Sequence, residues 1–257
     1  MLEDKTVNMV LGFKEGSNGN VRAAFITDAT QTDKLIFDDR CKQNLSLYLT
    51  KHEVKHHGKI AIVATVPVMR TIVMLLTEYQ IKEENIKVIG ISPEGQVLDL
   101  PDLGVMEKYL QSLQVDHPKK EKDLIEKLKI QSKAERFDFW KSELSRCIKC
   151  FACRSACPLC YCTRCATDCN QPQWISVPSH TLGNHEWHTL RAMHLTGRCT
   201  SCGECSRACP KDIPIAALTM FMSDVVEEHF GVKSGLSLKQ QSVMSTYKPE
   251  DKESFIK

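Results

Sequence analysis

The chain has 257 residues, of which 34 are Lys or Arg and 32 are Asp or Glu, so its formal net charge is +2 at pH 7. This near balance argues against a nucleic-acid-binding protein and against attachment to a membrane surface by charge. No apolar run approaches the roughly 20 residues that a membrane-spanning helix needs. The first residues are polar and charged and do not resemble a secretory signal, so we expect a reducing cytoplasm as the setting. Of the 13 cysteines, all except Cys41 lie within residues 147–209, and we expect the chemistry of the protein there.

A small α/β domain is predicted over about residues 1–110. Residues 59–65 and 87–92 are apolar, β-branched runs of the kind found in buried strands. Between them, residues 67–80 carry apolar side chains at helical spacing. The three segments predict a right-handed β-α-β unit with parallel strands. Two further elements are expected in the same domain: a strand over residues 22–27 and a helix over residues 44–51.

The turn after the first of these strands is where a ligand would bind in such a fold, because ligands lie beyond the carboxyl ends of parallel strands. This turn, residues 64–70, contains no glycine. It therefore lacks the loop that cradles phosphate groups, and no nucleotide site is predicted. Arg70 could bind an anion or a carboxylate of a partner; the alternative is a solvent-exposed arginine on the helix. Cys41 has no metal-binding neighbour in the sequence and is interpreted as a small buried side chain.

Residues 111–146 are predicted to form a helical linker. An amphipathic helix is expected first, with apolar positions at Leu124, Ile125, Leu128 and Ile130. A second helix is expected over residues 134–146, with Phe137, Phe139, Trp140 and Leu144 as its hydrophobic residues. Its aromatic side chains are predicted to shield a redox centre from water, since burial is one of the factors that set a redox potential.

The cysteine region contains one spacing twice. Cys147, Cys150, Cys153 and Cys157 are followed by Pro158, and Cys199, Cys202, Cys205 and Cys209 are followed by Pro210. The doubled C-x2-C-x2-C-x3-C-P run is typical of a two-cluster bacterial ferredoxin, in which the fourth cysteine of each run binds the other cluster. The sequence therefore predicts two 4Fe–4S clusters. One is assigned to Cys147, Cys150, Cys153 and Cys209, and the other to Cys199, Cys202, Cys205 and Cys157.

Disulfide bonds and zinc account for the doubled run less well than clusters do. Cysteines three residues apart on a tight loop can contact three irons of one cubane, and the fourth ligand then comes from elsewhere. A disulfide framework does not suit an odd number of cysteines in this ordered spacing. Zinc could explain one copy of the run, but two identical copies, each closed by a proline, favour iron–sulfur clusters.

The insert between the runs, residues 158–198, carries further ligand types. Cys160, Cys162, Cys165 and Cys169 could hold a third 4Fe–4S cluster. A zinc ion bound by thiols, or by thiols and histidines, and a set of free thiols are alternatives that stay open. A helix is expected around residues 185–194. On it, His188, Arg191 or His194 could donate a hydrogen bond to a cluster, or could only pack.

A long helix is predicted over residues 213–230, with Gly231 at its C-terminal cap. Residues 214–257 are expected to combine this helix with a polar tail that docks on a partner. The expected fold is an α/β N-terminal domain and a two-cluster bacterial ferredoxin-like (α+β) domain at residues 147–213, with a helical linker and flanking helices.

Four segments together resemble the iron–sulfur β-subunit family of deazaflavin-reducing hydrogenases and formate dehydrogenases, which includes related subunits of heterodisulfide-reductase-type complexes. They are residues 39–49, residues 60–70 with 88–91, residues 146–162 and residues 197–214. The resemblance covers about residues 18–230 and implies a relay subunit of a larger cytoplasmic oxidoreductase in anaerobes.

Two differences from this family limit what the resemblance implies. Family members often carry Gly-Cys-Asp where residues 66–68 are Val-Pro-Val, so a thiol-dependent role at that loop is not implied. Flavin-binding β-subunits have a long domain after the second run that this sequence lacks, so a flavin is not implied either.

The sequence thus predicts a subunit that relays single electrons between redox partners, such as a flavoprotein, a hydrogenase or a dehydrogenase, and other iron–sulfur proteins, with an electron-bifurcating assembly as one setting. It contains no recognisable nucleophile or acid–base pair, so we expect no bond chemistry of its own. Two alternatives stay open. In one, a flavin or small molecule near residues 65–70 exchanges electrons with the clusters, and the subunit itself reduces a soluble cofactor. In the other, the cysteine region is a zinc-stabilised docking scaffold.

Overall fold

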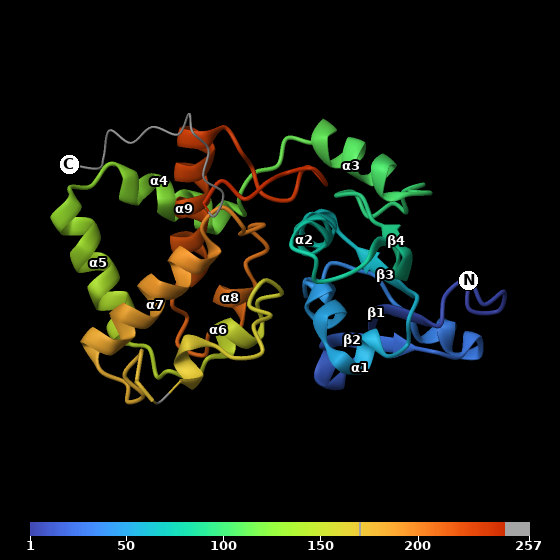
Figure 1. Ribbon diagram of the computed structural model, residues 1–257, viewed down its shortest axis with the longest axis horizontal. Coiled ribbons are helices and arrows are strands. Elements are labelled where there is room, and N and C mark those ends of the chain that lie inside the picture. The colour runs from blue at the N-terminus through green and yellow to red at the C-terminus, as the bar shows by residue number, and fades with distance from the viewer. Residues whose placement is uncertain (170, 245–257) are drawn as a thin grey trace.

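The structure is a computed structural model that describes residues 1–169 and 171–244. Figure 1 shows two lobes: the sheet lobe (residues 1–112) contains the strands and helices α1 to α3, and the cysteine lobe (residues 119–244) contains helices α4 to α9. The strands are β1 (Met9–Glu15), β2 (Val21–Ile26), β3 (Ile60–Ala64) and β4 (Ile86–Gly90). The helices are α1 (His52–Lys55), α2 (Val66–Thr77), α3 (Leu103–Ser112), α4 (Lys119–Lys129), α5 (Lys133–Ser145), α6 (Ala152–Ser155), α7 (Thr181–Leu195), α8 (Glu204–Arg207) and α9 (Ile215–Phe230). Short 3-10 helices lie at Ser17–Gly19, Ala29–Lys34, Leu45–Thr50, Glu83–Asn85 and Ala166–Asp168.

The sheet has the order β2-β1-β3-β4. Strand β3 pairs in parallel with β1 and β4, whereas β1 and β2 are antiparallel. The predicted parallel unit is confirmed as β3, α2 and β4, and the strand expected at residues 22–27 is β2. Strand β1 was not predicted, because Gly12 interrupts its apolar run. The Cδ2 atom of Leu35 lies 2.9 Å from where a Cβ atom of residue 12 would stand, so a larger residue there would displace the Leu35 side chain.

The main core of the sheet lobe lies on one face of the sheet. Alternate residues of β1, β3 and β4 pack there against α2, α3 and the 3-10 helix at Leu45–Thr50. The opposite face has a smaller core, in which Val10 and Ala61 pack against Leu2 and Leu35. The segment expected to be a helix at residues 44–51 is a 3-10 helix followed by α1. Asn44 caps the start of the 3-10 helix, because its side chain accepts a hydrogen bond from the backbone N–H of Ser46.

The two predicted linker helices are present as α4 and α5. The capping box of Ser132 and Glu135 starts α5. Leu144 is buried, and Trp140 packs in the same core as Cys147 and Cys153. The prediction that all three aromatic residues shield this region is wrong for Phe137, which is 53% exposed and contacts the ring of His185 on α7 edge-on. Ile130 follows the end of α4 and is exposed as well.

The cysteine lobe differs from the predicted α+β domain, because its described residues contain helices and no strand. The helices predicted at residues 134–146, 185–194 and 213–230 are present as α5, α7 and α9. The difference lies in the β part of the predicted class, because the sequence around the cysteines has helical rather than alternating periodicity. Helix α9 agrees with the prediction and ends at Gly231, whose φ of 66° is favourable for glycine. Residues 245–257 of the expected docking tail lie outside the described residues.

Candidate iron–sulfur sites

The two cysteine runs form loops of the same backbone shape. In the first run, Lys149 and Phe151 have φ angles of 51° and 57°; at the equivalent positions of the second run, Ser201 and Gly203 have 60° and 75°. The Lys149 amide donates a hydrogen bond to the Sγ atom of Cys147 at 3.3 Å. Residues in the left-handed backbone conformation turn successive backbone N–H groups towards one point, and an anionic group is stabilised at that point. The repeat of the sequence is therefore also a repeat of local structure.

The fourth cysteine of each run lies with the first three cysteines of the other run. Cys157 lines one small cavity together with Cys199, Cys202 and Cys205. Cys209 lies in the same hydrophobic core as Cys147 and Cys153, and its charge acts on both of their thiols. We call Cys147, Cys150, Cys153 and Cys209 the first group, and Cys157, Cys199, Cys202 and Cys205 the second group.

One cysteine differs from the other seven in exposure: Cys150 of the first group is exposed, whereas the others are buried or half-buried. Burial raises the pKa of the Cys199, Cys202 and Cys205 thiols, the last to about 12. In the first group burial raises the pKa of Cys147 and Cys153, whereas Cys150 is exposed. Since a metal binds the thiolate, a buried thiol of this kind releases its proton when it binds iron.

Unpartnered polar atoms lie beside both groups, on helix α7. His180 caps the start of this helix through the Gly183 amide. His188 and Arg191 are 1% and 3% exposed, and neither ring nitrogen of His188 nor the Nε atom of Arg191 has a hydrogen-bond partner among the described residues. Buried polar groups are normally satisfied, so an acceptor such as a cluster sulfide fits these positions. Of the three predicted donors, His194 is exposed and does not fit.

The protonation state of His188 follows from its surroundings. Burial, followed by the charges of Arg191, His185 and Lys149, lowers its pKa to about 4. The imidazole is therefore neutral at pH 7 and retains one N–H donor.

Each group thus has four thiols, with hydrogen-bond donors beside them. This set of residues suits two 4Fe–4S clusters.

Arg70 lies at the interface of the two lobes. It is 3% exposed, so the interpretation of it as a solvent-exposed residue is wrong. Its Nη1 atom donates to the Thr200 carbonyl at 3.0 Å, and its Nε and Nη2 atoms donate to the Ser234 carbonyl at 3.1 and 2.7 Å. Gly235 has a φ of 77° and packs so closely on the Arg70 carbonyl that a Cβ atom would clash. The thiols of Cys199 and Cys202 are near enough to act on the Arg70 charge.

Other contacts fix the second run against the sheet lobe. Thr71 and Thr200 share a hydrogen bond of 2.8 Å between their hydroxyl groups. The Glu204 carboxylate accepts from the Asn44 amide at 2.9 Å. Residues at such distant positions in the sequence give no local signal of their contact, so the sequence did not identify them.

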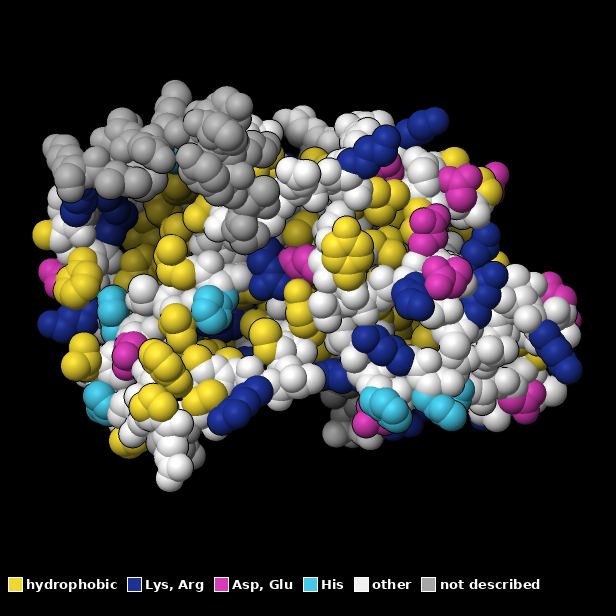
Figure 2. All heavy atoms as spheres, viewed as in Figure 1, with side chains coloured by type: hydrophobic (Ala, Val, Ile, Leu, Met, Phe, Trp, Pro, Cys, Tyr) yellow, Lys and Arg dark blue, Asp and Glu magenta, His cyan; other side chains and the backbone are white. Residues whose placement is uncertain are grey.

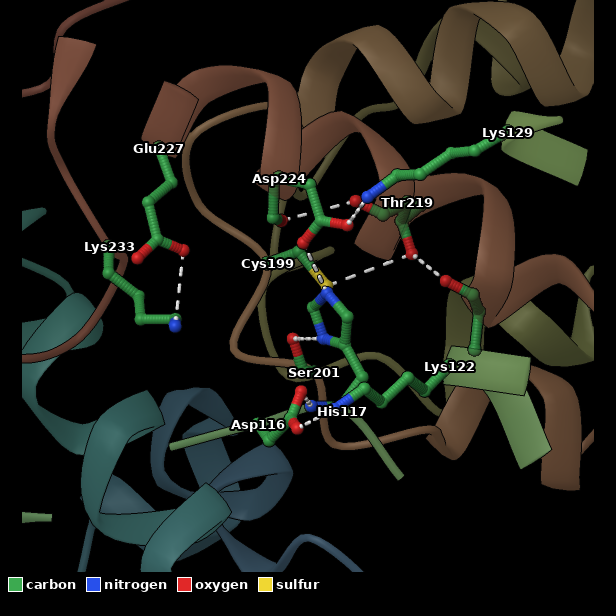
Figure 3. A network of polar contacts seen from close by, with 12 residues as sticks. Asp116, His117, Lys122, Lys129, Cys199, Ser201, Thr219, Asp224, Glu227 and Lys233 are labelled. Carbon is green, nitrogen blue, oxygen red and sulfur yellow. Dashed lines mark hydrogen bonds and ion pairs between the residues drawn. The ribbon is translucent and has the colours of Figure 1, made fainter. Parts of the chain in front are cut away.

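A polar network holds the linker and α9 beside the second run. Figure 3 shows the His117 ring between Ser201 and Asp224, at 3.1 Å from the Ser201 Oγ atom and 2.6 Å from the Asp224 Oδ1 atom. Lys129 also donates to Asp224, at 3.0 Å. In the same view, the Sγ atom of Cys199 lies 3.7 Å from the hydroxyl of Thr219 on α9. The loop of the second run is thus held from the sheet lobe, the linker and α9.

The insert cysteines are not arranged as one set. Cys160 lies beside Cys157, and their thiols interact so that the pKa of Cys157 is lowered. Cys162 is exposed, whereas Cys165 and Cys169 are half-buried near the ion pair of Arg154 with Asp168. Among the described residues, neither the insert nor the two cysteine groups bring three His, Cys, Asp or Glu side chains close enough to hold a single metal ion.

A pocket of about 480 Å³ lies beyond the carboxyl ends of β3 and β4. Residues 65–68 and 91–95 line it on the sheet lobe, and Ser201, Cys202 and Arg207 line it on the cysteine lobe. Cys41 is 5% exposed, as predicted, and forms part of the wall. The predicted ligand position at this turn is therefore hollow and reaches a cysteine of the second group.

Comparison with known families relates part of the cysteine lobe to iron–sulfur domains. Residues 159–214 match the model of a 4Fe–4S dicluster domain family. The matched residues include the insert cysteines and the second run, and they begin after Cys157, the last cysteine of the first run.

Two characterised relatives carry the comparison further. Over 98 residues the chain is 34% identical to the β-subunit of an F420-dependent formate dehydrogenase of Methanocaldococcus jannaschii, which covers 38% of this chain and 25% of the relative. Over 107 residues it is 27% identical to the β-subunit of F420-dependent formate dehydrogenase 1 of Methanococcus maripaludis, which covers 42% of this chain and 27% of that protein. The match thus spans about a quarter of each curated relative. Together with the dicluster match, these similarities support an iron–sulfur β-subunit family for this chain, as the sequence predicted.

None of the helices in residues 1–169 and 171–244 combines the length and apolar character needed to cross a membrane.

Proposed function

We propose that this chain is an electron-transfer subunit of an oxidoreductase, in which the first and second cysteine groups each hold one 4Fe–4S cluster. The observation that carries the proposal is the exchange of fourth cysteines, with Cys209 beside the first run and Cys157 beside the second. The similarity to dicluster domains and to formate dehydrogenase β-subunits supports the same function.

The chain's own residues bind the clusters and set their environment. Thiolates of the two groups are the ligands, and the clusters, when bound, take up and release single electrons. Backbone amides of the two loops and the buried side chains of α7 supply hydrogen bonds and positive charge. Trp140, Leu144 and the buried residues of α9 exclude water from the first group.

The first group is the end at which a partner subunit would dock. Cys150 is exposed, whereas the second group is covered by the sheet lobe through Arg70, Thr71 and Asn44. Figure 2 shows hydrophobic side chains exposed on the cysteine lobe. Exposed hydrophobic residues of this lobe include Ile148, Trp174, Val177, Leu182 and Met193. Hydrophobic surface of this kind marks protein contacts.

The proposed partners are the other redox subunits of a cytoplasmic complex of the hydrogenase, formate dehydrogenase or heterodisulfide-reductase type. The relatives named F420-dependent formate dehydrogenase support a formate dehydrogenase as one such partner. Which subunit donates and which accepts depends on potentials that the partners set.

The function is tested on anaerobically purified, full-length protein reduced with dithionite and then mixed with an oxidised one-electron acceptor. We expect reversible bleaching of the cluster absorbance and delivery of about two electrons per chain, one for each cluster. A protein with no reducible centre would contradict the proposal and favour the zinc-stabilised scaffold.

The pocket beyond β3 and β4 favours a second candidate function. Its volume is in the range of small-molecule sites, and its wall includes Cys202 of the second group. A small redox molecule bound there would exchange electrons with that group, as a flavin-bearing β-subunit does. Bound flavin released on denaturation, measured by its fluorescence, would support this candidate, and its absence would leave the relay as the function.

A further inference from the structure

The guanidinium group of Arg191 lies between the two cysteine groups. Its Nη2 atom donates to the carbonyl of Cys153, in the loop of the first group, at 3.1 Å. The same side chain lines the cavity formed by Cys157, Cys199, Cys202 and Cys205 of the second group. Arg191 therefore contacts both candidate sites, a position that no other arginine shares among the residues for which contacts are described.

Arg191 is a buried charge without a carboxylate partner. It is 3% exposed, and the structure gives it no ion pair among the described residues. Its Nε atom has no hydrogen-bond partner in the same residues. A buried guanidinium stays charged, and it is costly unless a negative group lies nearby. The groups that act on its charge are Cys205 and Cys157 of the second group, Cys160 of the insert and Cys153 of the first group.

Arg198 and Arg70, two other arginines near the sites, differ from Arg191 in what their charges face. Arg198 is neutralised by an ion pair with Glu78. Arg70 also lacks a carboxylate partner in the described residues, but all three of its nitrogens donate to backbone carbonyls, and the thiols near it, Cys199 and Cys202, belong to the second group only. The charge of Arg70 thus faces one group, whereas the charge of Arg191 faces two.

From this geometry we infer that Arg191 is a shared tuning residue, whose charge and free Nε–H raise the reduction potentials of both clusters together. The inference rests on the proposed function, because it needs a cluster in each group. Reduction adds one electron and hence one negative charge to a cluster, and a fixed positive charge in a medium of low polarity stabilises the reduced form. The two potentials are then raised by one residue, which keeps both clusters reducible by the same donor.

The test is a redox titration of the purified full-length protein with dithionite and mediators, followed by low-temperature EPR. In Arg191→Gln we expect unchanged iron content and a lower potential for both clusters, with the equilibrium constant for reduction falling at least tenfold, about 59 mV for a one-electron couple. Arg70→Gln should lower one potential only. Arg164→Gln, which removes an equal charge from an exposed position in the insert, should change neither.

Several outcomes would overturn the inference. Unchanged potentials in Arg191→Gln would do so, as would a shift confined to one cluster. If Arg191→Gln does not retain iron, Arg191→Lys decides, because lysine keeps the charge. Potentials close to those of the unmodified protein support a tuning role. A fall of at least tenfold in the equilibrium constant for reduction contradicts it. Failure of the proposed function has a different signature, since the unmodified protein would then contain no iron to titrate.

Discussion

Cys209 and Cys157 are each the last cysteine of a run, and each lies beside the other run. This arrangement ties the two loops together through the ligands themselves, so that neither loop can hold four thiols alone. The short helices α6 and α8, which contain the third cysteine of each run, contact one another and bring the fourth cysteines across. At the scale of single residues, the exchange is the feature from which the assignment of ligands follows.

The exchange is tested by combining substitutions in one cysteine group. Cys209→Ser should damage the cluster of Cys147, Cys150 and Cys153, with a loss of up to about four irons per chain. Cys147→Ser should do the same, and the double variant should lose no more than either single variant, because both residues serve one cluster. Iron is measured by a colorimetric assay on anaerobic protein, and the altered cluster by EPR.

A loss of about eight irons in the double variant, against about four in each single variant, would show that the two cysteines serve different clusters and that the assignment is wrong. Cys169→Ser is the matched control from the insert. Because the dicluster family match begins at residue 159, the competing assignment uses the insert cysteines as the first ligand set. It requires Cys169→Ser to lose about four irons, whereas our assignment expects no loss.

At the scale of elements, helix α2 joins the sheet lobe to the cysteine lobe. Arg70 and Thr71 from its first half contact the second run. Glu78, which follows its last turn, pairs with Arg198 and accepts from the Tyr161 hydroxyl at 2.9 Å. Arg198 also lies over the Tyr161 ring, 5.3 Å from its centre. Glu78, at the end of this helix, thus contacts the insert near its start, at Tyr161, and at its end, at Arg198.

Glu78→Ala should loosen this junction. The change leaves the Arg198 guanidinium partly buried without its carboxylate, and we expect a loss of about 1–3 kcal/mol in the free energy of unfolding. Thermal unfolding of the cluster-containing protein measures the loss. Glu84→Ala is the control, because Glu84 is 70% exposed in its pair with Lys82, and a change within about 0.5 kcal/mol is expected. Equal effects of the two substitutions would contradict the proposed role of α2.

Prediction from the sequence worked where one pattern is repeated or periodic. The spacing of the cysteines predicted two groups, and the structure places Cys157 with the second run and Cys209 beside the first. The ligand assignment and the bound clusters stay predictions. Helical periodicity predicted α2, α4, α5, α7 and α9, and His188 and Arg191 were among the residues named as possible hydrogen-bond donors to a cluster. Strand β1 was missed because Gly12 breaks its apolar run, and the α+β class expected for the cysteine domain differs from the structure, whose described residues contain no strand there.

The contacts of Arg70 could not be predicted from the sequence. Its partners, Thr200 and Ser234, are 130 and 164 residues away along the chain, and no local pattern marks an arginine that binds carbonyl groups at such a distance. An arginine on a helix surface is usually exposed. This general rule therefore predicted an exposed Arg70, which is in fact buried. The interface between the lobes is therefore a result of tertiary packing, which only the structure reveals.

At the scale of the whole molecule, the two lobes have different tasks. The sheet lobe covers the second group and forms a pocket beside Cys202. The cysteine lobe leaves Cys150 of the first group exposed next to hydrophobic surface. A relay needs an accessible end for each partner, and each of these two places gives access to one cysteine group.

The central claim is that the chain holds two 4Fe–4S clusters. Iron, sulfide and zinc content of anaerobically purified protein, together with low-temperature EPR after dithionite reduction, tests it most directly. We expect about eight irons and eight sulfides per chain, no zinc, and EPR signals of two reduced clusters close enough to interact. About twelve irons would add a third cluster at the insert cysteines. Zinc with almost no iron would contradict the claim and leave a docking scaffold.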